Sequence, residues 1–123
     1  MEKKDLKPAG IFRYFEEICQ VPRPSKKEGK IIAYLKNFGE SHQLETKVDE
    51  TGNILIRKPA YPGMENRKTI VLQAHMDMVC EKNNDVKHDF LTDPIETYID
   101  GEWLKAKGTT LGADNGIGIA TAL

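Results

Sequence analysis

His75 and Asp77 stand two residues apart at the end of an apolar run, TIVLQA. If this run is an extended strand, residues two apart point to the same face, about 6.6 Å from one another at a rise of ~3.3 Å per residue. An imidazole that binds a metal through one nitrogen usually gives its other N–H to a carboxylate or carbonyl, which fixes the tautomer. A strand ending in His-x-Asp therefore offers a metal ligand and its orienting group. The alternative is a histidine that merely pairs with a nearby acid.

A glycine-rich turn, residues 108–118 (GTTLGADNGIG), is the second segment whose residues could take part in chemistry. Glycine is used where the backbone must adopt a positive φ or approach something closely. Asp114 lies between these glycines and in front of an apolar stretch that reads as a helix. A carboxylate at the start of a helix is favoured by the helix dipole and can cap the first amides. The alternative function of Asp114 or Asn115 is therefore that of an N-cap only.

The strings AHMDMV and KGTTLGADNGIG together resemble the aminoacyl-histidine dipeptidases, cytosolic di-zinc enzymes of the carboxypeptidase G and peptidase T superfamily. The resemblance extends over nearly the whole chain and includes VPRPS (residues 21–25) and DETGN (residues 49–53). It implies that His75 is a ligand of one zinc ion and that Asp77 is a catalytic carboxylate holding this histidine. It also implies that Asp114 bridges both metal ions and is followed by a cis peptide bond.

The implied cofactor is a pair of divalent metal ions, zinc in the first place, with cobalt or manganese as substitutes. Imidazole and carboxylate ligands suit zinc. Two such ions about 3.5–4 Å apart polarise a peptide carbonyl and lower the pKa of a shared water. The resemblance implies a dipeptide substrate, Xaa-His including β-alanyl-histidine, that the parent protein hydrolyses.

The chain departs from the family pattern after Asp114. In the family a Glu-Glu pair that includes the general base, a further Asp and a distant His all follow the aspartate turn, and none is present before Leu123. The apolar residues 117–123 also contain no helix stop signal. We therefore expect residues 1–123 to be the N-terminal portion of a catalytic domain, without its remainder or the lid domain, and inactive alone. The serious alternative is a non-catalytic metal-binding or interaction domain.

The composition narrows the class of protein. The formal net charge of −1 gives no basis for binding nucleic acid or an anionic membrane by charge. No apolar run approaches the ~20 residues of a membrane span, and the N-terminus has no apolar signal core. Two cysteines, Cys19 and Cys80, fit a reducing compartment. We expect a cytoplasmic protein, with a homodimeric parent as a further expectation.

The hydrophobic pattern predicts an α/β fold with a mixed, mostly parallel sheet and flanking helices. Apolar spacing predicts a helix over residues 8–20 with Cys19 in the core, and a second helix after a capping box at residues 25–28. The expected strands are residues 44–49, 53–58, 69–77, 96–99 and 102–107. A type I′ turn is expected at Asp100-Gly101, and Trp103 is expected in the core.

Residues 81–94 are expected to form a long polar loop. Four of its side chains are either extra metal ligands or parts of a solvated loop: Asp85, His88, Asp89 and Asp93. Other ligand classes fit poorly. The glycine spacing around Asp114 matches no nucleotide-binding loop, and the alternating acids of an EF-hand are missing.

Overall fold

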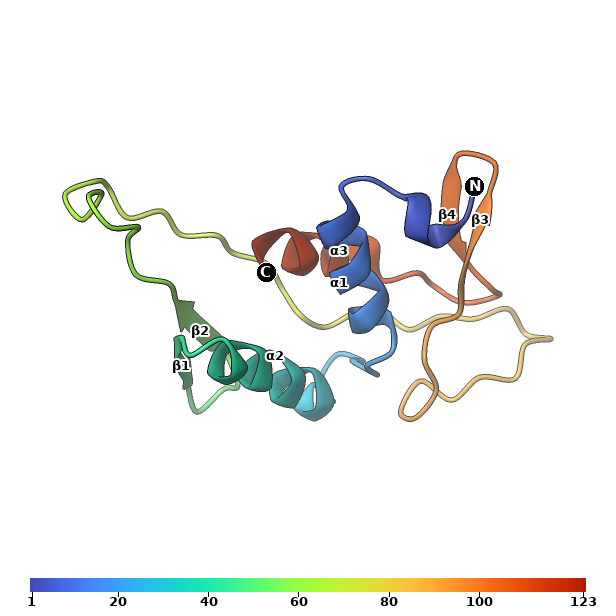
Figure 1. Cartoon of the computed structure of the whole chain (residues 1–123). Coiled ribbons are helices and arrows are strands. Elements are labelled where there is room, and N and C mark those ends of the chain that lie inside the picture. Colours follow the sequence, from blue (N-terminus) through green and yellow to red (C-terminus); the bar gives the residue numbers. More distant parts are fainter. The chain divides into compact units, whose positions relative to one another are not determined.

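The computed structural model describes all residues, 1–123, as two compact units. The first consists of Met1–Ile31 with Gln73–Leu123, and the second of Ile32–Leu72. The elements, labelled in Figure 1, are η1 (Lys3–Asp5), α1 (Ala9–Cys19), α2 (Gly29–Ser41), β1 (Glu45–Val48), β2 (Ile54–Arg57), β3 (Thr97–Asp100), β4 (Trp103–Ala106) and α3 (Ala113–Ala122). None of the helices has the length and apolar character that crossing a membrane requires.

The core of the first unit forms where α1 packs against α3. Figure 1 shows the two helices side by side. Phe15, Ile18 and Cys19 lie on one face of α1 at helical spacing and are buried, and Ile119 and Ala120 are buried from α3. The helix predicted over residues 8–20 and the buried position of Cys19 are thus confirmed.

The second unit is built around the hairpin of β1 and β2. The strands pair antiparallel from Glu45↔Arg57 to Val48↔Ile54, as predicted. Asp49 closes the turn, because its Oδ1 accepts the backbone N–H groups of the three residues 51–53, each at 2.9 Å. Within the same unit β1 lies directly on α2: a methyl group added to Gly39 would collide with the Thr46 side chain.

The second predicted hairpin also forms, from β3 and β4, but two details of the prediction are wrong. Asp100 pairs with Trp103, so the two turn residues are Gly101 and Glu102. Gly101 has a φ of +62°, whereas Glu102 has no positive φ, which is the pattern of a type II′ and not a type I′ turn. Trp103 is 70% exposed and is no part of the core.

The strand predicted over residues 69–77 does not form. The segment has no ladder partner, and Ile70, Val71 and Leu72 are 82%, 79% and 67% exposed. A strand requires a neighbour for its backbone N–H and C=O groups, and an apolar run alone does not supply one. Both sheets present are two-stranded and antiparallel, so the expected mostly parallel sheet is not observed. Directly after the segment, Met78 makes an isolated parallel bridge with Pro24.

Candidate functional site

His75 lies between two carboxylates in the first unit. Its Nδ1 is 3.1 Å from Asp77 Oδ1 and 3.1 Å from the Asp77 carbonyl oxygen. Its Nε2 is 2.9 Å from Oδ1 of Asp114, 39 residues further along the chain. The structure therefore brings together all three residues that the sequence singled out. His75 is half exposed and the Asp114 side chain is 95% exposed, so the group is open to solvent.

Both carboxylate oxygens of Asp77 are engaged. Oδ1 faces His75, and Oδ2 accepts a hydrogen bond of 2.6 Å from the hydroxyl of Ser25. The Ser25 hydrogen bond, assisted by that of His75, holds the pKa of Asp77 below its ordinary value despite some desolvation. Asp77 is thus an ionised acceptor that holds the His75 ring through Nδ1.

Ser25 is a site residue that sequence reasoning missed. Its place in SKKE suggested a capping box for the second helix, but α2 begins at Gly29, and Glu28 accepts the backbone N–H of Lys26 at 2.7 Å. The predicted capping box is therefore wrong, because Ser25 lies in a turn at residues 24–27, closed by the Lys27 N–H on the Pro24 carbonyl oxygen, before the helix begins. No spacing rule connects positions 25 and 77. The one available signal was the match of VPRPS to the family.

The backbone around Asp114 explains why its carboxylate is free for other partners. Gly112 precedes α3 with a φ of +74°, and Asp114 and Asn115 have non-helical dihedrals. The peptide bond between Asp114 and Asn115 is cis, as the resemblance implied. Asn115 Oδ1 accepts the N–H of Gly118 at 3.1 Å. Asn115 therefore performs the capping, whereas Asp114 points to His75.

The contacts of His75 determine where its protons are. Nδ1 faces two acceptors and must carry a hydrogen, and Nε2 also faces an acceptor. The hydrogen bond to Asp114, followed by that to Asp77, raises the pKa of His75 above its ordinary value. A metal ion at Nε2 would replace the proton that this nitrogen shares with Asp114, so metal binding and proton release are coupled here.

The donor atoms present fit part of a zinc site. Imidazole nitrogen and carboxylate oxygen are ordinary zinc ligands, at about 2.0–2.2 Å from the ion. At a tetrahedral angle two such ligands are about 3.3 Å apart, so the 2.9 Å between His75 Nε2 and Asp114 Oδ1 would widen by only about 0.4 Å. The chain contains no group of three or more His, Cys, Asp or Glu side chains placed to hold a metal ion. His75 Nε2 and Asp114 Oδ1 are thus two donor atoms, fewer than the four ligands usual for zinc.

The acidic loop residues do not join this group. Asp93 Oδ2 accepts the Asp89 N–H at 2.8 Å, and Asp89 Oδ1 accepts the Leu91 N–H at 2.9 Å, so these two carboxylates close a local turn. His88 packs edge-on against Phe90, with ring centroids 4.5 Å apart. The contacts of Asp89 and Asp93 fit the solvated-loop alternative, and no metal-ligand cluster includes Asp85. His88 does not fit it, because its Nε2 is buried without a hydrogen-bond partner.

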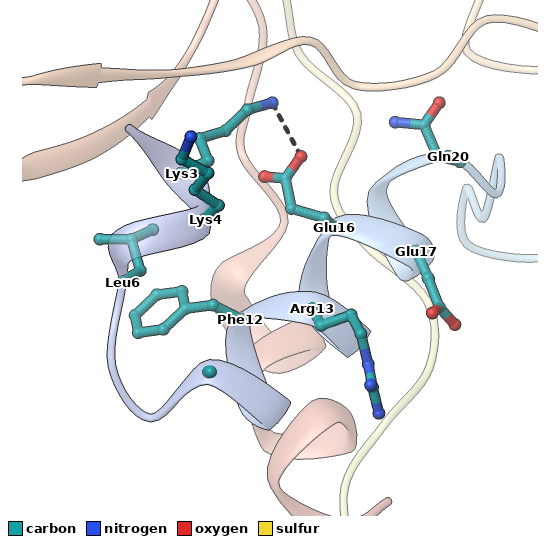
Figure 2. A pocket seen from close by; sticks show the side chains of 9 residues that line it. Lys3, Lys4, Leu6, Phe12, Arg13, Glu16, Glu17 and Gln20 are labelled. Atoms are coloured by element: carbon teal, nitrogen blue, oxygen red, sulfur yellow. Dashed lines mark hydrogen bonds and ion pairs between the residues drawn. The ribbon is translucent and has the colours of Figure 1, made fainter. Parts of the chain in front are cut away.

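A cavity of about 530 Å³ lies elsewhere in the first unit, between η1 and α1. Figure 2 shows its lining, in which Leu6 and Phe12 form the apolar wall. Lys3 and Glu16 form an ion pair of 2.9 Å at its edge. This cavity includes none of His75, Asp77 and Asp114, so we place the candidate chemistry at the imidazole and not in the cavity.

Comparison with known proteins places this geometry in context. No family model matches the chain. The chain is 55% identical over 122 residues to the cytosol non-specific dipeptidase of Escherichia coli (strain K12), covering 99% of this chain and 25% of that protein. Its structure matches the crystal structure of aminoacylhistidine dipeptidase from Vibrio alginolyticus with a TM-score of 0.95 and 52% identity, again over 99% of this chain and 25% of the other. The mixed helix-and-strand fold is therefore shared with that protein. The resemblance to aminoacyl-histidine dipeptidases is thus confirmed along 99% of this chain, which spans about a quarter of the length of each relative.

Proposed function

We propose that residues 1–123 are the N-terminal portion of the catalytic domain of a metal-dependent dipeptidase, in which His75 and Asp114 are metal ligands. The observation that carries the proposal is the contact of 2.9 Å between His75 Nε2 and Asp114 Oδ1, with Nδ1 of the same ring held by Asp77. An imidazole fixed through one nitrogen and facing a carboxylate with the other is the arrangement expected of a metal ligand. The dipeptidase names of two relatives support the reaction class.

Each residue has a distinct part in the proposed site. His75 presents Nε2, and Asp77 acts through it as the catalytic carboxylate by retaining the Nδ1 hydrogen. Ser25 holds Asp77 in place through the bond of 2.6 Å. Asp114 directs Oδ1 to His75, and its 95% exposed side chain leaves Oδ2 accessible, as a bridge between two ions requires. The proposed cofactor is two divalent ions, zinc or alternatively cobalt or manganese, which supply carbonyl polarisation and a water of lowered pKa when bound.

The proposed substrate of the longer protein is a dipeptide, Xaa-His including β-alanyl-histidine. This rests on one relative being an aminoacylhistidine dipeptidase, while the other is described as non-specific. We infer a cytoplasmic location from the cytosol dipeptidase relative, and retain a homodimeric parent as a proposal. No glutamate is among the hydrogen-bond partners of His75, Asp77 or Asp114. Hydrolysis requires a general base, and the Glu-Glu pair that includes the base in the resembled family follows the aspartate turn and is not in residues 115–123, so we expect the 123-residue chain alone not to hydrolyse dipeptides.

Calorimetric titration of the 123-residue chain with zinc tests the metal site. Because two donors remain, we expect weak binding that disappears in His75→Ala and in Asp114→Ala. His42→Ala is the matched control, since His42 is an exposed histidine of the second unit whose ring contacts the Phe38 carbonyl oxygen at 2.8 Å. Zinc binding that is equal in His75→Ala, Asp114→Ala and the wild type would refute the ligand assignment. Sub-micromolar affinity lost in His75→Ala would refute the expectation of an incomplete site.

Hydrolysis assays separate the dipeptidase from the alternative of a non-catalytic metal-binding domain. A longer protein that contains this chain should cleave β-alanyl-histidine and lose the activity in Asp114→Ala. Its sequence should contain a Glu-Glu pair within a few tens of residues of Asp114. Absence of both the pair and the activity would favour the binding domain. Turnover by the 123-residue chain itself, abolished by Asp114→Ala, would show that the base lies within these residues.

A further inference from the structure

Arg23 carries a charged group in the core of the first unit. Its side chain is 1% exposed and is the largest of the fully buried side chains. Burial lowers the pKa of the Arg23 guanidinium below its ordinary value, because the charged form loses hydration. Removing a charge from water is unfavourable unless hydrogen bonds replace the lost hydration. The partners of Arg23 therefore indicate what this side chain does.

Those partners lie on the two segments that carry the candidate site. Arg23 Nη1 donates to the carbonyl oxygen of Met76, between His75 and Asp77, at 3.4 Å. Arg23 Nη2 donates to the carbonyl oxygen of Gly112, two residues before Asp114, at 2.8 Å. The carbonyl oxygen of Arg23 also accepts the N–H of Met78 at 2.9 Å. One residue thus connects both segments of the site, 53 and 89 positions away along the chain.

The glycine-rich turn is shaped around this guanidinium. A Cβ on Gly112 would lie 2.5 Å from Arg23 Nη2, and a Cβ on Gly116 would lie 2.7 Å from the same nitrogen. Glycine at these two positions, on both sides of Asp114, leaves the space that the guanidinium fills. Arg23 Nε remains buried without a partner. The side chain is thus placed to reach the two carbonyl groups and not to satisfy all of its own donors.

We propose that Arg23 is a positioning residue that sets the separation of His75 and Asp114. A planar guanidinium reaches two carbonyl oxygens at once in a fixed geometry, which a lysine ammonium does not do. Its hydrogen bond to the Met76 carbonyl oxygen holds the segment that carries His75. Its hydrogen bond to the Gly112 carbonyl oxygen holds the turn that carries Asp114. The significance of this separation for metal binding rests on the proposed function, whereas the separation itself can be measured without metal.

The test uses Arg23→Lys and Arg23→Met in the 123-residue chain, with Arg13→Met as the control. Arg13 is an exposed arginine of α1, and its guanidinium lies over the ring of Tyr14, 4.9 Å from the centroid. Three quantities are measured: the thermal midpoint, the affinity for zinc by calorimetry, and the ¹⁵N shifts of the His75 ring at fixed pH without metal. Residues that support a ligand indirectly typically change metal affinity 10–100-fold when removed.

We expect both Arg23 variants to lose at least about tenfold in zinc affinity and to shift the His75 Nε2 signal toward that of an imidazole without a partner, while Arg13→Met changes neither. A merely structural role would lower the thermal midpoint and leave the ring signal of the folded fraction unchanged. If Arg23→Met does not fold, Arg23→Lys provides the test, because it retains the charge on a single donor nitrogen and lacks the planar two-nitrogen fork. Wild-type zinc affinity and ring shifts in a folded Arg23 variant would overturn the proposal.

Failure of the proposed function gives a different result. In that case the wild-type chain would not bind zinc through His75, yet the ring signal would still move in the Arg23 variants, and the positioning role would stand. If the wild type binds zinc through His75 and the variants bind it equally well, the positioning role fails and the metal site stands.

Discussion

Replacing Gly112 by alanine tests how tightly the turn before α3 is constrained. Gly112 has a φ of +74°, in the left-handed region that disfavours residues with a Cβ. The added methyl carbon would lie 2.5 Å from Arg23 Nη2, 2.8 Å from Met78 Sδ and 3.1 Å from Met78 Cε. The substitution therefore combines an unfavourable backbone conformation with a collision against a buried charge and a buried thioether.

The two effects can be assigned separate magnitudes. Left-handed backbone costs a residue other than glycine about 1–2 kcal/mol. Forcing an extra methyl group into a packed core typically costs about 1–3 kcal/mol. We therefore expect Gly112→Ala to lower the free energy of unfolding by about 2–5 kcal/mol in total. Because displacement of Nη2 also releases the Gly112 carbonyl, zinc affinity should fall in the same variant.

Two other glycines separate these contributions in urea unfolding experiments. Gly101 has a φ of +62° and no atom within 4 Å of an added Cβ, so Gly101→Ala should show the backbone cost alone, about 1–2 kcal/mol. Gly10, in the first turn of α1, also has open space, and Gly10→Ala should be neutral or stabilising by up to about 1 kcal/mol. If Gly112→Ala lowers the free energy of unfolding no more than Gly101→Ala does, the Arg23 guanidinium moves aside without cost and Gly112 is not constrained by packing.

Three further substitutions or measurements test the site and the core. Ser25→Ala removes an exposed hydroxyl, so the thermal midpoint should stay unchanged while the zinc affinity measured by calorimetry falls about 10–100-fold. Ser25→Thr keeps a hydroxyl and should keep the wild-type zinc affinity. Wild-type zinc affinity in Ser25→Ala would contradict the role of this hydroxyl in holding Asp77. Burial raises the pKa of the Cys19 thiol to about 12, so a thiol reagent at pH 8 should label the partly buried Cys80 first and Cys19 only upon denaturation; equal labelling rates would contradict this. In the metal-free chain the neighbouring carboxylates raise the pKa of His75, so its contribution to stability is complete below the unfolded value of about 6.5 and is lost as pH rises through the folded value. The difference in unfolding free energy between wild type and His75→Gln should therefore shrink over that interval, and a growing difference would refute the assignment.

Local patterns in the sequence predicted those features that depend on near neighbours along the chain. Helix α1 and both hairpins follow from apolar spacing and turn residues, and the structure confirms them. The contact of His75 with Asp77 is of the same kind, since the two residues are only two positions apart. It forms although the surrounding strand does not, because two residues at this spacing are close in any extended backbone.

Tertiary structure decided what depends on remote segments. In the folded chain Asp114 contacts His75, Ser25 contacts Asp77, and Arg23 is buried with hydrogen bonds to both site segments. Of these, the family resemblance anticipated His75 and Asp114 only, and residue spacing anticipated none. The same dependence explains the errors: Trp103 and residues 69–77 have the composition of buried strand, but burial and pairing require a neighbouring surface that local sequence does not encode.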